Sequence, residues 1–324
     1  MKAPHFWNQK NIISSMLIPA AWLYRLAGWL RALIVRPYRS SLPVICVGNI
    51  TSGGTGKTPV TAYLAKLAKS QGLAPVILSR GYGGTITTPT FVDPEQHDAR
   101  LCGDEPLLLS QSAPVLIARH RGEGARFIEA QNRFDIIIMD DGMQNPQLHK
   151  DSVIAVFDGK IGIQNGRIFP AGPLRTSLSQ GRAQADIMMM NGADDTSLLV
   201  HPYDKSALFF HLKAEAAIPA IKKTTPLFAF AGIGRPERFF ETLANEGYYL
   251  AQTKAFGDHH GYNQDDITAL VEGARALSAL LITTQKDWVR LPPAIQKHIA
   301  YLPVSLHISA TDEAILAAHL NANR

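Results

Sequence analysis

The stretch VGNITSGGTGKTPV, Val47 to Val60, constrains the fold of this chain more than any other. The apolar, β-branched run LPVICVGNI leads into it, and PVTAYLAKLAKSQG, with apolar residues at helical spacing, follows it. A strand, a glycine-rich turn and a helix in that order direct backbone N–H groups and a helix N-terminus at a phosphate. The sequence therefore predicts a nucleotide-binding loop made of Thr51, Ser52, Gly53, Gly54, Thr55, Gly56, Lys57 and Thr58.

One position departs from the general pattern G-x-x-x-x-G-K-[ST]. Thr51 stands where that pattern has its first glycine, the one farthest from the lysine. In such a loop Lys57 reaches the β and γ phosphates and the Thr58 hydroxyl takes a magnesium position. A turn with an incidental Gly-Lys-Thr is the alternative, and the flanking strand and helix favour the nucleotide site.

The metal also requires a carboxylate, which usually follows an apolar strand. FDIIIMDDGMQ supplies Asp140 and Asp141 at that position, although an aspartate after a strand is also common in plain surface loops. Paired with the phosphate loop, the two are predicted Mg²⁺ ligands. The later segment NGAD, residues 191–194, lacks the lysine of the guanine-reading pattern N-K-x-D, which favours ATP.

Other polar loops offer candidates for acid–base chemistry. CGDEP contains Asp104, and FGDHHGY contains His259; each is by itself more typical of a solvated surface group. A carboxylate and an imidazole that converge on a substrate hydroxyl would suit general-base assistance to phosphoryl transfer. Arginines that are either anion clamps or simply exposed occur at Arg80, Arg119, Arg121 and Arg175.

Short apolar strands alternate with helical segments along the chain, which favours a mostly parallel sheet with helices on both faces. At 324 residues the chain is long enough for two domains, and the alternation restarts near residue 225. We expect an N-terminal helix over 1–36, a phosphate-loop core over 37–224 and a smaller α/β domain over 225–324.

Composition limits the setting and the partners. With 46% hydrophobic and 18% charged residues the chain is globular, and two distant cysteines suit a reducing compartment. The net charge of +5 suits anionic partners such as phosphates or acidic lipid. Neither a zinc-finger spacing nor a basic run suggests nucleic acid, and no obligate protein partner is inferred.

The N-terminal segment has two interpretations. Its uncharged run Asn11–Tyr24 has 14 residues, fewer than the roughly 20 that span a bilayer. Leu23, Leu26, Leu30 and Ile34 form one helical stripe interrupted by arginines. The helix either packs on its own domain or lies on an anionic membrane with arginines snorkelling, and Pro19 should kink or divide it.

Several segments together carry a resemblance to a known family. VGNITSGGTGKTP, LSRGYGG, GDEPLLL, DDGMQNP, NGRIFPAGPLR, AGIGRPERFF, FGDHHGY and LITTQKDWVRL occur in the order and spacing of tetraacyldisaccharide 4'-kinase, the lipid A 4'-kinase of Gram-negative bacteria. The chain is similar to that family from the N-terminal helix to Leu291. The resemblance implies a two-domain α/β protein on the cytoplasmic face of the inner membrane. It implies transfer of the ATP γ-phosphate to the 4'-hydroxyl of a tetraacylated glucosamine disaccharide.

The resemblance also implies residue roles. Thr51 to Thr58 would be the ATP loop, and Thr58 with Asp140 the magnesium ligands. Asp104 with His259 would activate the sugar hydroxyl, and Lys57 with Arg119 would stabilise the transferred group, a place that Arg121 could take instead. Two positions depart from the commoner family pattern, Asn145 for histidine and Thr176 for glutamate. Lys286 and Asp287 of TTQKD receive no role.

Two rival functions stay open at this stage. A membrane-bound ATPase switch of the partition or division type shares the G-G-x-G-K-T core and an amphipathic anchor. Those proteins carry a lysine immediately before the paired glycines, where this chain has Ser52. A soluble kinase of a small metabolite is the second rival, and its N-terminal helix would be part of the core.

Overall fold

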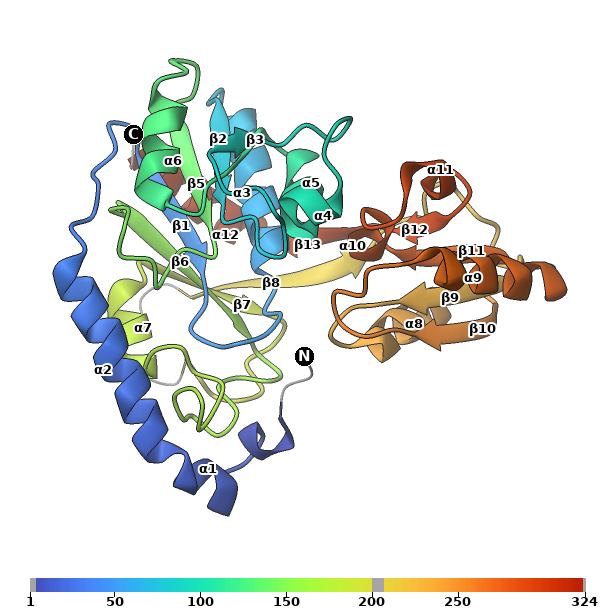
Figure 1. Cartoon of the computed structure of the whole chain (residues 1–324), viewed down its shortest axis with the longest axis horizontal. Coiled ribbons are helices and arrows are strands. Elements are labelled where there is room, and N and C mark those ends of the chain that lie inside the picture. The colour runs from blue at the N-terminus through green and yellow to red at the C-terminus, as the bar shows by residue number, and fades with distance from the viewer. Residues whose placement is uncertain (1–3, 200–206, 323–324) are drawn as a thin grey trace.

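The protein contains two β-sheets, as a computed structural model shows for residues 4–199 and 207–322 (Figure 1). The larger sheet has nine strands in the order β13-β8-β7-β6-β1-β5-β2-β4-β3. Its neighbours pair in parallel from β8 to β4, and only the two edge strands, β13 and β3, are antiparallel. Its strands are β1 (Val44–Gly48), β2 (Pro75–Ser79), β3 (Thr90–Phe91), β4 (Val115–Ile117), β5 (Ile136–Asp140), β6 (Ser152–Asp158), β7 (Ile187–Asn191), β8 (Ala207–Ala214) and β13 (Val304–Ile308).

Helices cover both faces of this sheet, as the apolar strands require. Alternate residues of β1 point to opposite sides: Ile45 and Val47 join one buried cluster, Val44 and Cys46 the other. The first face is covered by α3 (Lys57–Ser70), α5 (Asp104–Ser110) and α12 (Ala310–Ala322). The second face is covered by α6 (Arg121–Glu129) and α7 (Leu178–Gln184), and the short helix α4 (Ala99–Cys102) precedes α5. The predicted doubly covered, mostly parallel sheet is confirmed.

A second sheet of four parallel strands, β10-β9-β11-β12, forms a smaller unit beside the first. Its strands are β9 (Leu227–Ala231), β10 (Leu250–Ala255), β11 (Leu280–Thr284) and β12 (Ala300–Leu302). One face packs on α8 (Pro236–Asn245), and the other packs on α9 (Gln264–Ala276), α10 (Gln285–Trp288) and α11 (Pro293–Gln296). The alternation of strands and helices that restarts near residue 225 therefore corresponds to the second sheet.

The chain returns to the larger sheet at its C-terminal end. After β12, strand β13 pairs antiparallel with β8, with Val304 opposite Ala214 and Ile308 opposite Phe210. Leu316 and Leu320 of α12 are buried in the same cluster as α3. The expected assignment of these last residues to the smaller domain is therefore wrong, because their apolar side chains complete the core of the larger sheet and not that of the smaller one.

The N-terminal segment forms η1 (His5–Trp7), α1 (Ile12–Met16) and α2 (Ile18–Ile34). Pro19 lies in the first turn of α2, where its missing N–H has no helical partner to lose, so the predicted division falls before it at Leu17. Only Ala21 of α2 is buried, whereas Trp22, Leu26 and Leu33 are 66%, 50% and 63% exposed. Within the described residues no helix is both long and apolar enough to cross a bilayer.

Candidate active site

The phosphate loop joins the end of β1 to the first turn of α3 as expected. Gly53 and Gly56 have φ angles of 141° and 98°, in the region that favours glycine. A Cβ on Gly53 or Gly54 would meet nothing within 4 Å, so this side of the loop is open. A Cβ on Gly56 would lie 3.3 Å from the ring of Phe210 on β8, which closes the opposite side. The loop backbone is therefore open on the side of Gly53 and Gly54.

Side chains and a neighbouring strand segment hold the loop in shape. The amide nitrogen of Asn49 donates to Thr55 Oγ1 at 3.2 Å and to the Gly53 carbonyl at 3.4 Å. The Ser52 N–H donates to the carbonyl of Pro173 at 2.7 Å, and Thr51 forms an isolated bridge with Leu174. Such a loop needs little rearrangement to bind a phosphate, which limits the entropic cost of binding.

Lys57 and Arg175 share one carboxylate, that of Asp141. Lys57 Nζ lies 3.7 Å from Asp141 Oδ1, and Arg175 Nη1 donates to both oxygens at 2.9 and 3.1 Å. Burial raises the pKa of Asp141, but the two cations outweigh it and the pKa stays below its usual range. Asp141 is therefore an ionised partner of Lys57 and Arg175. Among the four loop arginines named from the sequence, Arg175 thus binds a carboxylate.

Asp140, by contrast, has little to balance its charge. Its side chain is buried and accepts one hydrogen bond, from the Thr61 hydroxyl at 3.0 Å. Burial, with the negative charges of Glu105 and Asp141, raises the pKa of Asp140 to about 7. A buried carboxylate at the end of a strand beside a phosphate loop fits a divalent cation, and of the two aspartates Asp140 fits it better.

No group of three or more His, Cys, Asp or Glu side chains suited to a metal ion occurs in residues 4–199 and 207–322. That finding agrees with the kind of site expected here. A magnesium ion at a phosphate loop keeps waters and phosphate oxygens as ligands and draws only one or two from the protein. Thr58, in the first turn of α3, and Asp140 would be sufficient.

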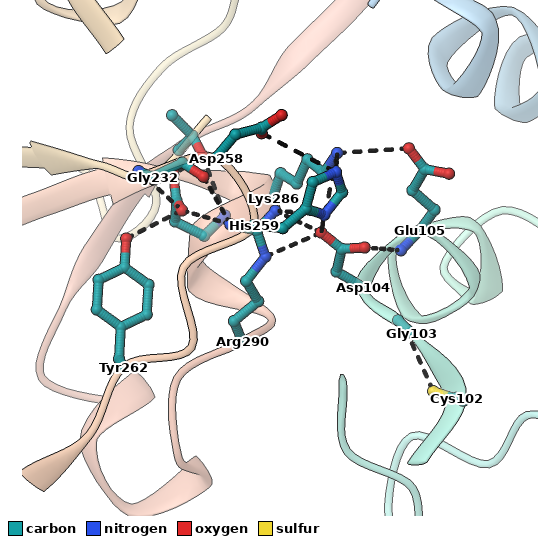
Figure 2. A network of polar contacts seen from close by, with 12 residues as sticks. Cys102, Gly103, Asp104, Glu105, Gly232, Asp258, His259, Tyr262, Lys286 and Arg290 are labelled. Atoms are coloured by element: carbon teal, nitrogen blue, oxygen red, sulfur yellow. Dashed lines mark hydrogen bonds and ion pairs between the residues drawn. The ribbon is translucent and has the colours of Figure 1, made fainter. Parts of the chain in front are cut away.

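Asp104 and His259 meet, although 155 positions separate them in the chain (Figure 2). Asp104 begins α5 in the larger unit, and His259 follows β10 in the smaller one. Nδ1 of His259 lies 3.0 Å from Oδ2 of Asp104, which is only 5% exposed. His259 has a φ of 55°, a conformation that non-glycine residues adopt rarely, and its N–H donates to the Gly232 carbonyl at 3.0 Å. The fold therefore brings Asp104 and His259 together, which the sequence alone could not show.

The pair lies within electrostatic reach of the phosphate loop. Glu105, next to Asp104, is among the charges that raise the pKa of Asp140. Glu105 also accepts a hydrogen bond from Lys286 Nζ at 3.4 Å, and that nitrogen lies 3.5 Å from His259 Nε2. The beginning of α5 thus connects the Asp104–His259 pair with the carboxylate beside the loop.

Lys286 and Arg290 contact the pair, and Asp287 contacts Arg290. The sequence left Lys286 and Asp287 without a role and did not single out Arg290. Arg290 binds Asp104 through Nε at 2.8 Å and through Nη2, and it binds Asp287 through Nη1 at 2.9 Å (Figure 2). The signal that could have found them is the motif LITTQKDWVRL, which places all three within one short segment.

The arginine expected to stabilise the transferred group has two candidates in different surroundings. Arg119 is exposed and donates to the carbonyl of Gly84 at 3.3 Å. Arg121 is buried, donates to the carbonyl of Ala118 and lies 3.5 Å from that of Asp140. Burial lowers the pKa of Arg121 to about 10. The role of Arg119 stays a prediction, and Arg121 is the one adjacent to the strand end that carries Asp140.

The two residues that depart from the family pattern, Asn145 and Thr176, form hydrogen bonds with residues close to them in the chain. Asn145 Oδ1 accepts from the Gln147 N–H at 2.8 Å, and its carbonyl accepts from Lys150 Nζ at 2.7 Å. The Thr176 hydroxyl donates to Gln180 Oε1 at 3.1 Å. Both side chains therefore have local structural partners, which is sufficient to account for them in this chain.

Comparisons with known proteins agree on one family. The family model LpxK, tetraacyldisaccharide-1-P 4'-kinase, matches residues 13–322. A tetraacyldisaccharide 4'-kinase of Methylobacterium nodulans is 44% identical over 99% of this chain and 96% of its own length. One of Rhodopseudomonas palustris is 42% identical over 97% of this chain and 93% of its own length.

A solved structure shares the fold. A crystal structure of LpxK from Aquifex aeolicus, in complex with ATP, superposes with a TM-score of 0.79 and covers 96% of this chain and 99% of its own. The two sequences are 23% identical, so this likeness concerns the α/β architecture alone.

Proposed function

The chain belongs to the tetraacyldisaccharide-1-P 4'-kinase family, and from this premise we propose how it acts. It transfers the γ-phosphate of ATP to the 4'-hydroxyl of a tetraacyldisaccharide 1-phosphate, the lipid A precursor. The observation that carries the proposal is the contact of Asp104 with His259, which joins a carboxylate of the larger unit to an imidazole of the smaller one. A switch ATPase needs the loop but not an acid–base pair supplied by a second unit.

The phosphate loop binds and orients the nucleotide. Backbone N–H groups of Gly53 to Thr58, together with the N-terminus of α3, point at the β and γ phosphates. Lys57, already close to Asp141, reaches the γ-phosphate and neutralises the charge that spreads over its oxygens in the transition state. Arg175 shares Asp141 and so leaves Lys57 free to turn toward the phosphate.

Proton transfer falls to the Asp104–His259 pair. The sugar oxygen forms a bond to the γ-phosphorus, while the bond from phosphorus to the β–γ bridging oxygen breaks and its electron pair leaves with ADP. The hydroxyl proton passes to Nε2 of His259, and Asp104 accepts from Nδ1 of the ring. Positioned acid–base groups of this kind contribute about 10²- to 10⁴-fold in rate.

A magnesium ion fits beside the loop. Thr58 and Asp140 would hold it, since Asp140 is a buried carboxylate with a single hydrogen-bond donor and a raised pKa. When bound, Mg²⁺ would offset the negative charge of the phosphate oxygens. Asp141 remains engaged with Lys57 and Arg175, which makes it a less suitable ligand than Asp140.

The N-terminal helix suits contact with the inner-membrane surface on its cytoplasmic face. At about 100° per residue, Trp22, Leu26, Trp29 and Leu33 fall on one side of α2. The opposite side carries Tyr24, whose ring contacts Phe169 of the protein body with centroids 5.4 Å apart. The apolar side therefore points away from the body, and it is flanked by Arg25, which can reach anionic headgroups. This geometry would bring the acyl chains of the substrate and the kinase to one surface.

The test is transfer of labelled phosphate from ATP to tetraacyldisaccharide 1-phosphate in detergent, comparing the wild type with Lys57→Ala. Transfer that collapses by about 10²-fold or more in the variant is expected. ATP hydrolysis with no labelled lipid would contradict the proposal and support the switch ATPase. Deletion of residues 1–36 tests the other rival, a soluble kinase of a small metabolite. If the shortened protein folds and still binds vesicles, α2 is not the membrane contact.

A further inference from the structure

The segment Thr284–Arg290 closes around the Asp104–His259 pair, and its contacts are unusually complete. Arg290 gives two donors, Nε–H and Nη2–H, to the same oxygen, Oδ2 of Asp104. Its third nitrogen, Nη1, donates to Asp287 Oδ1 and to the carbonyl of Gly232, each at 2.9 Å. The side chains of Arg290 and Asp104 are 5% and 6% exposed, so this ion pair is largely shielded from water.

Asp287 holds the guanidinium in that orientation. It is fully buried, and its carboxylate accepts from the Tyr262 hydroxyl at 2.9 Å, the Thr284 hydroxyl at 2.6 Å and the Gly232 N–H at 3.0 Å. With Arg290 as its cation, Oδ1 of Asp287 accepts from three donors and Oδ2 from one. A satisfied buried network of this kind has one arrangement, because any other would leave a charge unpaired.

The network also fixes the backbone that carries His259. The Gly232 peptide donates to Asp287, and its carbonyl accepts from both Arg290 Nη1 and the N–H of His259. His259 needs that support because its φ of 55° is disfavoured for a residue with a Cβ. Arg290 therefore contacts both ends of the pair: the carboxylate directly, and the histidine through the Gly232 carbonyl.

The shorter of two contacts at Nδ1 of His259 places the proton there: Asp104 Oδ2 lies 3.0 Å away, and Arg290 Nη2 lies 3.5 Å away. A guanidinium offers donors only, and two of them already point at Asp104 Oδ2, so that oxygen must be an acceptor. The bond of 3.0 Å between Oδ2 and His259 Nδ1 then requires a proton on Nδ1. In the neutral ring this leaves a lone pair on Nε2, which Lys286 Nζ approaches to 3.5 Å and which can accept the substrate proton.

We propose that Arg290, anchored by Asp287, is a positioning residue that keeps Asp104 as a pure acceptor and so reserves Nε2 of His259 for the substrate proton. The proposal rests on the kinase function above and on the roles given there to Asp104 and His259, and it adds to them the role of Arg290 and Asp287. Burial opposes ionisation of Asp104, but the bond from His259 and the charges of Lys286 and Arg290 outweigh it and lower its pKa. A carboxylate of that kind is a poor base.

The other charges around the pair agree with this assignment. Lys286 Nζ lies 3.8 Å from Asp104 Oδ2 and 3.5 Å from His259 Nε2, and Asp258 Oδ1 lies 3.9 Å from Nε2. Glu105 pairs with Lys286 at 3.4 Å. Two cations therefore face Asp104, whereas one cation and one carboxylate face Nε2 of His259.

The experiment compares Arg290→Met and Arg290→Lys with the matched control Arg275→Met, an exposed arginine on α9. Phosphate transfer to tetraacyldisaccharide 1-phosphate gives kcat and the KM for ATP. The ¹⁵N chemical shifts of the His259 ring, assigned with His259→Ala, give the tautomer at pH 8. We expect Arg290→Met to lose about 10- to 100-fold in kcat with little change in KM, and to lose the preference for the proton on Nδ1. Arg290→Lys, which keeps one cationic donor, should recover part of both.

Unchanged kcat and an unchanged tautomer in Arg290→Met would overturn the proposal. So would a loss of kcat with the tautomer intact and no recovery in Arg290→Lys, which is the result expected of a merely structural arginine. If Arg290→Met does not fold, Arg290→Lys decides by the same two measurements. Failure of the kinase function is a separate result, because it appears as absent transfer in the wild type while the tautomer can still be read.

Discussion

The hydroxyl of Thr61 on α3 donates a hydrogen bond of 3.0 Å to Oδ1 of Asp140 at the end of β5. The bond connects the helix that follows the phosphate loop with the carboxylate best suited to the metal. Because Asp140 is buried and lies near the negative charges of Glu105 and Asp141, it keeps a proton more readily than an exposed aspartate.

Asp140→Asn should therefore stabilise the ligand-free protein at alkaline pH. The pKa of Asp140 is raised to about 7 in the folded state, so the folded protein binds a proton that the unfolded chain releases above its own, lower pKa. The stability linked to this proton is present at low pH and is lost as pH rises toward and through 7. We expect a gain on the order of 1–3 kcal/mol at pH 8 and little change at pH 4. Thermal unfolding without ATP or Mg²⁺ measures it.

Asp141→Asn is the matched control, and we expect it to change the stability in the opposite direction. The pKa of Asp141 is lowered in the folded state by Lys57 and Arg175 against the effect of burial, so its stabilisation is present above the unfolded pKa and lost below it. The variant should be less stable than the wild type at neutral pH. Equal behaviour of the two asparagine variants would refute this distinction.

Gly56→Ala should damage the phosphate loop. The backbone at Gly56 has a φ of 98°, and an added Cβ would press on the Phe210 ring at 3.3 Å. We expect a loss of about 1–3 kcal/mol in stability and weaker ATP binding, measured by denaturant unfolding and by calorimetric titration. Gly28→Ala in α2 is the comparison, since nothing lies within 4 Å of its Cβ and alanine favours the helix. If ATP binding is equally affected in both variants, the explanation from backbone geometry fails.

Arg175→Ala should weaken ATP binding through Lys57. With Arg175 removed, Asp141 has Lys57 as its remaining close cation, and that pairing competes with the phosphate. The KM for ATP should rise by about tenfold, with a smaller change in kcat. Arg275→Ala, an exposed arginine on α9 of the smaller unit, is the control. A fall in kcat with an unchanged KM would instead indicate that Arg175 acts on the transition state.

The double variant Leu26→Asp/Leu30→Asp should lose binding to anionic vesicles without loss of stability. Both side chains are about half exposed on α2, so the change removes no core contact, but it places charge on the side expected to enter the membrane. Sedimentation with vesicles that contain anionic lipid measures binding. Ile315→Asp, on an exposed site of α12, supplies the control, and vesicle binding that is equal in both proteins would exclude α2 as the contact.

Local patterns were sufficient for most of the fold. The apolar strands around Val44–Gly48 and Ile136–Asp140 and the helix from Lys57 were predicted because each is specified by nearby residues. The assignment of the last residues to the smaller domain was wrong for the converse reason, because their pairing depends on a distant part of the chain. Val304–Ile308 forms a strand wherever it pairs, and its partner, β8, lies about 90 positions earlier in the chain.

The sequence by itself determined the phosphate loop, since Gly53 to Thr58 require only their own backbone conformation and the strand and helix beside them. It also determined the family, through motifs whose order is visible without a fold. Only the tertiary structure decided that Asp104 meets His259, that Arg290 and Asp287 set the orientation of the pair, and that Asp141 belongs to Lys57 and Arg175 while Asp140 stays unbalanced. The physical reason is that charge and hydrogen-bond partnership depend on distances of a few ångströms between residues that are far apart in the chain.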